Sequence, residues 1–154
     1  MPRAAVVYDS KWGNTQQVAA EIAAGIREAG AQADLIQVRQ ATPENLAGYD
    51  AILIGSPNHF GTATAGIRRL INRLGRPVLA GRLVTFFDTC LPREELKAAR
   101  RMEQRARRKA PGLAVVAPEL SVRVRGMKGP LREGELEKAR GFGQRVAGWL
   151  KTGR

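Results

Sequence analysis

A short stretch near the N-terminus, SKWGNT at residues 10–15, concentrates hydroxyl, amide and glycine residues. It follows an apolar run at residues 4–8 and precedes apolar positions at helical spacing from Val18 onward. A polar turn between a buried strand and a helix directs backbone N–H groups toward one point, where an anion is favoured. The stretch therefore predicts a phosphate site, unless Ser10, Asn14 or Thr15 serves only as a helix cap.

This first turn matches neither of two common phosphate-binding motifs. A P-loop needs a longer loop that ends in Lys-Ser or Lys-Thr. The dinucleotide fingerprint needs three glycines, and only Gly13 is present here. What remains is a run of backbone amides from Lys11 to Thr15, together with nearby hydroxyl and amide side chains. This set suits a phosphate monoester that is held by hydrogen bonds.

A second polar stretch, GSPNHFG at residues 55–61, offers groups of a different kind. Pro57 stiffens the turn, and Gly61 permits an unusual backbone angle. His59 and Phe60 offer a contact surface for a flat ring, unless Phe60 is buried in the core. His59 is the only histidine. It could carry a positive charge near neutral pH and pair with an anion, or it could be an ordinary exposed loop residue.

A third polar stretch, DTCL at residues 88–91, contains the only cysteine, Cys90. No histidine partner is present in the sequence to activate its thiol, so we interpret Cys90 as a packing residue rather than a nucleophile. One cysteine excludes an internal disulfide. One cysteine and one histidine also provide no ligand set for zinc, so no metal site is predicted.

Alternating strands and helices position these three turns. The apolar patterns predict strands at residues 3–9, 33–38, 50–56, 82–88 and 113–117, with helices at residues 14–29, 63–74, 93–109 and 133–151. This alternation predicts an α/β fold in which helices cover both faces of a parallel sheet. Because ligands bind beyond the carboxyl ends of such strands, the turns after strands one, three and four are expected to meet there.

The length of 154 residues suits one domain. No apolar run is long enough to span a membrane. The N-terminus lacks the pattern of a signal peptide, so we expect a cytoplasmic protein. Lys and Arg number 26 against 14 Asp and Glu, which gives a formal net charge of +12. Such a charge can indicate nucleic acid as a partner, acidic partners, or simply a basic proteome.

The arginine-rich stretch at residues 100–109 is the strongest candidate for nucleic-acid binding. Its apolar positions share one helix face, and most of its arginines lie elsewhere, as in an ordinary solvated helix. It has no interleaved aromatic residues and matches no nucleic-acid-binding module. We therefore favour an acidic protein partner over nucleic acid.

The order SKWGNT, then SPNHFG, then FFDT at the end of the fourth strand resembles the flavodoxin family. The segment GPLREGELEKA, residues 129–139, is similar to a pattern in its short, single-domain members. The resemblance covers nearly the whole chain. It implies a flavodoxin-like three-layer sandwich around a five-stranded parallel sheet in the order 2-1-3-4-5.

The resemblance also implies that FMN is bound noncovalently at the three turns. The first turn would hold the phosphate through Ser10, Lys11, Trp12, Gly13, Asn14 and Thr15. The second would line one side of the flavin ring through Ser56, Pro57, Asn58, His59, Phe60 and Gly61. The third would lie against its other side through Asp88, Thr89 and Cys90. Trp12 would cover the phosphate or the ribityl chain, unless it is an exposed aromatic without a role.

Two departures from the family pattern bear on function. The third turn has no aromatic residue after Phe87, so one side of the ring is open or is covered by Leu91. The positive charge would favour the reduced, anionic flavin, which predicts a less strongly reducing cofactor.

We expect an electron-transfer protein that docks an acidic redox partner. The alternatives are an FMN-dependent reductase of quinones that is supplied by NADH or NADPH, and a binding module without flavin.

Overall fold

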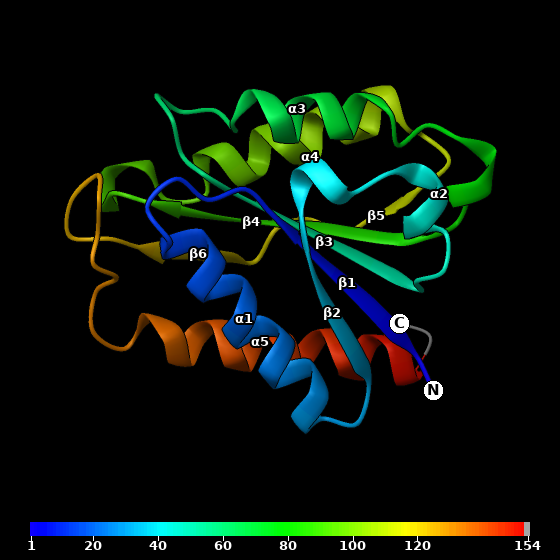
Figure 1. The fold of residues 1–154 in the computed structure, drawn as a ribbon, viewed down its shortest axis with the longest axis horizontal. Helices are drawn as coiled ribbons and strands as arrows, with labels where there is room; N and C mark the ends of the chain where they lie inside the picture. Colours follow the sequence, from blue (N-terminus) through cyan, green and yellow to red (C-terminus); the bar gives the residue numbers. More distant parts are fainter. Residues whose placement is uncertain (153–154) are drawn as a thin grey trace.

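The computed structural model describes residues 1–152. A parallel sheet in the order β2-β1-β3-β4-β5 forms the middle layer, and β6 pairs with β4 (Figure 1). Its strands are β1 (Arg3–Tyr8), β2 (Gln32–Gln37), β3 (Ala51–Pro57), β4 (Leu83–Cys90), β5 (Ala114–Val115) and β6 (Leu120–Arg123). The α/β class and the predicted strand order are confirmed.

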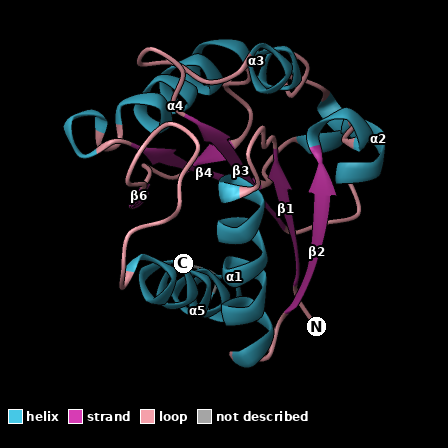
Figure 2. Cartoon of the chain, turned by 60° about the vertical axis from the view of Figure 1, so that its left-hand side comes forward, coloured by secondary structure: helices cyan, strands magenta, loops and turns pink. Residues whose placement is uncertain are grey.

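Helices form the two outer layers. α1 (Asn14–Glu28) and α5 (Glu135–Thr152) pack on one face of the sheet. α3 (Ala65–Asn72) and α4 (Lys97–Lys109) pack on the other, with the short α2 (Pro43–Leu46) beside them (Figure 2). Three 3-10 turns, η1 (Val38–Gln40), η2 (Pro77–Leu79) and η3 (Pro92–Glu94), complete the elements of the described residues. No helix in residues 1–152 is long and apolar enough to cross a membrane.

Two hydrophobic cores lie on opposite faces of the sheet. In β1, Val6 packs toward α1 and α5, whereas Val7 packs toward α3 and α4, as the alternation of side chains along a strand requires. β3 is buried from Ala51 to Ser56 because helices cover both of its faces. These cores fix the carboxyl ends of β1, β3 and β4, from which the three turns extend.

α1 and α5 approach each other through glycines. A Cβ atom at Gly143 would lie 2.1 Å from the carbonyl oxygen of Ile22, and one at Gly25 would lie 2.1 Å from that of Arg140. This packing fixes α1 and therefore its N-terminus, which forms part of the first turn.

The fifth strand differs from its predicted form. β5 pairs with Leu83 and Val84 of β4, and β6 pairs with the segment from Phe87 to Cys90. The predicted strand at 113–117 was therefore only partly right, because the ladder is interrupted at residues 116–119. After this interruption, β6 carries the following loop to the carboxyl end of β4.

Two helix predictions also need correction. The helix predicted from residue 93 begins at Lys97, because η3 and an extended Glu95 precede it. No helix was predicted between β2 and β3, yet this segment contains α2, which Thr42 caps in a capping box with Asn45. Neither change moves the predicted turns away from the carboxyl edge of the sheet.

Candidate functional site

The three predicted turns meet in one pocket at the carboxyl edge of the sheet. The hydroxyls of Thr15 and Thr89 lie 2.9 Å apart and link the first turn to the end of β4. The Asn58 N–H donates to the Thr89 carbonyl at 2.9 Å and links the second turn to the same point. Ten predicted residues line this pocket: Ser10, Lys11, Trp12, Asn14, Thr15, Pro57, Asn58, His59, Thr89 and Cys90.

The first turn leaves backbone donors free in front of α1. Gly13 is the N-cap residue, with a φ of 90°, which favours glycine. Its N–H donates to Ser10 Oγ at 3.0 Å. Within the described chain no side chain caps α1, and its first turn has no acidic residue. The simple capping interpretation is therefore wrong, and the first helical amides remain available to an anion.

The second turn is a tight hairpin whose tip is exposed. His59 and Thr62 exchange backbone hydrogen bonds of 2.8 and 3.1 Å. Phe60 and Gly61 between them have φ angles of 52° and 83°, as in a type I′ turn. Phe60 is 98% exposed, so the alternative that it is buried in the core is wrong. Phe60 and Gly61 are not among the residues that line the pocket.

Ser56 lies below the second turn and supports it. Its hydroxyl accepts a hydrogen bond from the Thr64 N–H at 3.0 Å. The Thr64 hydroxyl in turn donates to the Asp9 carboxylate at 2.7 Å. Ser56 is fully buried and does not line the pocket, so its observed contacts are structural.

The third turn begins later than predicted, because β4 continues through Cys90. Asp88 is consequently not in a loop. Its carboxylate accepts hydrogen bonds from the Ser121 hydroxyl and from the Ala99 N–H of α4, the latter at 2.9 Å. Burial raises the pKa of Asp88 to about 6. Asp88 does not line the pocket, whereas its neighbour Thr89 faces α1, as alternation along a strand requires.

Cys90 lines the pocket but is buried. Its Sγ atom lies 3.1 Å from Ser121 Oγ. Burial raises the pKa of the thiol to about 11, which keeps it protonated near neutral pH. These features agree with a packing residue.

A fourth loop, residues 124–131, was missed as part of the site. The Val124 N–H donates to the Cys90 carbonyl at 2.9 Å, which anchors the loop beside the third turn. Val124, Met127 and Leu91 complete the pocket lining. Lys128 Nζ lies 4.9 Å from the centre of the Trp12 ring, so this loop also covers the first turn. The sequence feature that could have predicted this loop as part of the site is its position, because it follows the carboxyl end of the fifth parallel strand.

The pocket offers distinct groups to a ligand that has a phosphate and a flat ring. The amides of α1 and Lys11 provide donors and positive charge for an anion. Asn58 Nδ2 lies 3.5 Å from Glu94 Oε2, while Asn58 Oδ1 is buried and has no hydrogen-bond partner in residues 1–152. A buried acceptor without a donor is costly, so this oxygen suits a ring N–H. Trp12, Leu91 and Met127 supply apolar contacts.

The family described as Flavodoxin domain matches residues 5–126, which is most of the chain. The chain belongs to the flavodoxin domain family. Curated relatives named NAD(P)H dehydrogenase (quinone) include one from Acidithiobacillus ferrooxidans, 33% identical over 54% of this chain and 52% of its own. One from Archaeoglobus fulgidus is 32% identical over 54% and 56%. The chain thus spans about half the length of these relatives.

Solved flavodoxin structures share the fold. A flavodoxin from the domain Archaea has a TM-score of 0.81 and 21% identity, covering 97% of this chain and 99% of its own. Flavodoxin 2 from Bacillus cereus has a TM-score of 0.76 and 23% identity, covering 94% and 96%. At these identities the flavodoxin family members are similar to this chain in fold.

Proposed function

We propose that this flavodoxin-domain protein binds FMN at the four-loop pocket and transfers electrons. One observation carries the proposal: Asn58, whose buried Oδ1 has no hydrogen-bond partner in residues 1–152, lines the same pocket as Asn14 and Thr15 at the uncapped N-terminus of α1. The N-terminus of α1 suits the FMN phosphate, and Asn58 Oδ1 suits an N–H of its ring. When bound, FMN would supply the redox chemistry.

The residues of the chain would bind and orient the cofactor. Lys11 and the amides of α1 would hold the phosphate, and Trp12 would cover it from the solvent side. Asn58 would fix the flavin ring through its side-chain oxygen, and Leu91 would lie against an exposed face of that ring. Since Cys90 stays protonated and Asp88 faces α4, neither is assigned a chemical step.

The surface around the pocket suits a partner protein with acidic groups around an apolar centre. Phe60, Leu91, Met127 and Trp12 are all exposed large apolar residues, and the last three line the pocket. Lys11 and Lys128 lie within 5.2 and 4.9 Å of the Trp12 ring centre, which places positive charge beside this apolar rim. Such a combination favours an acidic redox partner, because complementary charge guides association and apolar contacts hold the complex.

The test compares FMN with riboflavin, which lacks the phosphate. We expect FMN to remain bound through desalting and to bind about tenfold or more tightly than riboflavin, since charge-assisted hydrogen bonds are involved. Asn58→Ala should weaken both ligands alike, because it affects only the ring. Quenching of flavin fluorescence measures both affinities. Protein that stays colourless with FMN would support the alternative of a module without flavin.

A second candidate is an FMN-dependent quinone reductase supplied by NADH or NADPH. It is favoured by the names of the relatives and by the third turn, where Leu91 is 41% exposed and no aromatic residue stands after Phe87. An open ring face would leave room for a second ring to stack. Rapid reduction of the FMN-loaded protein by NADH or NADPH alone would favour the enzyme. Reduction only through a second protein would favour the electron carrier.

A further inference from the structure

A second polar pocket lies outside the four-loop site, in the groove between α3 and α4. Its volume is about 270 Å³. Four arginines line it, together with small, amide and apolar side chains: Thr62, Ala63, Arg68, Ile71, Arg101, Met102, Gln104, Arg105 and Arg108. Arg101, Arg105 and Arg108 follow helical spacing along one face of α4. We call these nine residues the arginine groove.

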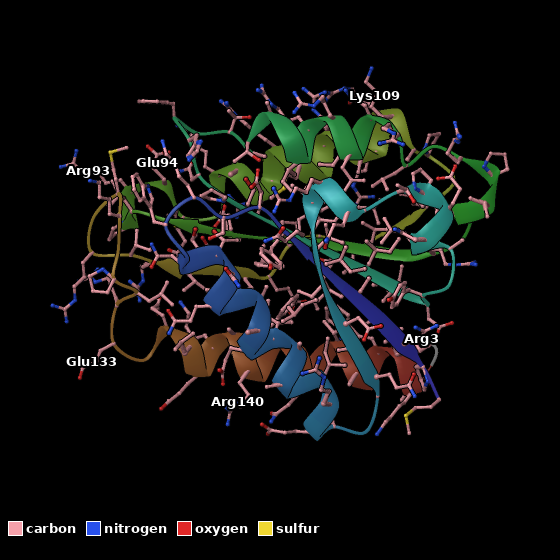
Figure 3. All side chains as sticks on the ribbon, viewed as in Figure 1. Arg3, Arg93, Glu94, Lys109, Glu133 and Arg140 are labelled. Carbon is pink, nitrogen blue, oxygen red and sulfur yellow. The ribbon has the colours of Figure 1, made fainter. Side chains whose placement is uncertain are left out.

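The arginine groove lacks internal compensation for its charge. No carboxylate lines it. The sequence has no Asp or Glu from residue 51 to residue 87, and Glu103 is the only acidic residue within α4. Glu103 pairs with Arg107 at 2.8 Å, outside the groove. Figure 3 shows nitrogen-tipped side chains along the outer side of α3 and α4, with Lys109 at the end of α4.

Two arginines indicate a binding site rather than a solvated surface. Arg68 Nε is buried and has no hydrogen-bond partner within residues 1–152. A buried guanidinium N–H that has lost water and gained no acceptor is unfavourable until an acceptor arrives. Arg105 Nη1 donates to Asn72 Oδ1 at 2.8 Å, which holds its guanidinium at the groove. A donor and a positioned cation are therefore in place before any ligand binds.

The groove favours phosphate over other anions. Guanidinium groups bind phosphate oxygens through paired, charge-assisted hydrogen bonds. A phosphate or diphosphate also places more negative charge in a small volume than one carboxylate does. The sequence has no Phe, Trp or Tyr from residue 61 to 85 or within α4, so the groove offers no ring on which nucleic-acid bases stack. A small ligand is therefore favoured over a nucleic acid.

We propose that the arginine groove is a binding site for the phosphate groups of a small phosphorylated ligand. Its source is free phosphate or diphosphate, or the phosphate of a nucleotide. Thr62 belongs both to the groove and to the hairpin with His59, so the groove adjoins the second turn of the flavin pocket. The site is nevertheless distinct, because no residue lines both pockets.

Calorimetry at constant ionic strength tests the site. The ligands are inorganic phosphate, diphosphate, and the pair NADP⁺ and NAD⁺, which differ by one phosphate. We expect Arg68→Gln to weaken diphosphate binding about tenfold or more, as for the loss of a hydrogen bond to a charged group. Tighter binding of either nucleotide than of diphosphate would identify a nucleotide source, whereas weaker binding of both nucleotides than of diphosphate would identify free phosphate or diphosphate.

Arg107→Gln is the matched control, because it removes the same charge from α4 outside the groove. Equal weakening by both variants, or no diphosphate binding by the unaltered protein, would overturn the proposal. If Arg68→Gln fails to fold, as judged by thermal unfolding, Arg101→Gln takes its place. FMN binding is measured in parallel and should be unchanged in Arg68→Gln, so failure of the groove and failure of the flavin site are separate results.

Discussion

At the scale of single residues, Asp88 shows what a linear motif conveys and what it omits. The sequence places Asp88, Thr89 and Cys90 together at the end of a strand, and we predicted all three against the ligand. In the structure Thr89 faces α1 and Asp88 faces α4, because neighbouring residues on a strand point to opposite faces. The prediction treated these residues as a loop, for which alternation does not apply.

Asp88 predicts a pH dependence of stability. Its pKa is about 6 in the fold, against about 3.9 in an unfolded chain. Between these values the folded state binds the proton and the unfolded state does not, so stability falls as pH rises from about 4 to about 6. The loss approaches about 3 kcal/mol. Asp88→Asn should remove this slope and be the more stable variant at neutral pH, as measured by urea unfolding across this range.

Comparing the unaltered protein with Asp88→Asn separates the contribution of Asp88 to the pH dependence of stability from the contributions of other carboxyl groups. The pKa of Glu135 is lowered by hydrogen bonds from Arg123 and Lys138, which outweigh the effect of burial, and its contribution has the opposite slope. That contribution is present in both proteins and cancels. Identical pH profiles for the two would show that Asp88 ionises in the fold as it does in water.

At the scale of elements, the apolar periodicity predicted most helices and strands to within a few residues. The apolar periodicity could not predict how closely α1 and α5 approach each other. That distance depends on Gly25 and Gly143, which lie far apart in sequence and meet only in the fold. The interruption of the fifth strand was also not evident, because the apolar run from Leu113 to Ala117 continues past the end of β5 at Val115. The fourth loop was missed with it, since its place at the site depends on β6.

Two glycines in α5 should respond in opposite ways to alanine. Gly143→Ala would force a Cβ against the backbone of α1, and we expect a loss of about 1–3 kcal/mol of stability. A Cβ atom at Gly148 would instead point into open space, with no neighbouring element of residues 1–152 within 4 Å. Gly148→Ala should therefore gain about 1 kcal/mol from helix propensity. Thermal or urea unfolding measures both. A loss in both variants would contradict the close-packing explanation.

At the scale of the whole molecule, the protein carries a net charge of +12, and the FMN that we propose to bind at the four-loop pocket would become more negative on reduction. A positive field favours that change. Because salt screens the field over about 10 Å at 0.1 M, the midpoint potential of the FMN-loaded protein should become more negative as salt is added. Redox titration at low and high salt measures this shift. A potential that is independent of salt, or that rises with it, would contradict an effect of the net charge on the flavin.

The broken fifth strand has a consequence for how copies of the molecule meet. An unbroken edge strand presents a row of free backbone groups, on which another chain can add a strand and begin to aggregate. Here the edge is divided into strands of two and four residues, and Pro118 between them has no N–H to donate. An incoming strand could match only a few groups before losing register. The same interruption that delivers the fourth loop to the pocket thereby protects this side of the sheet from self-association.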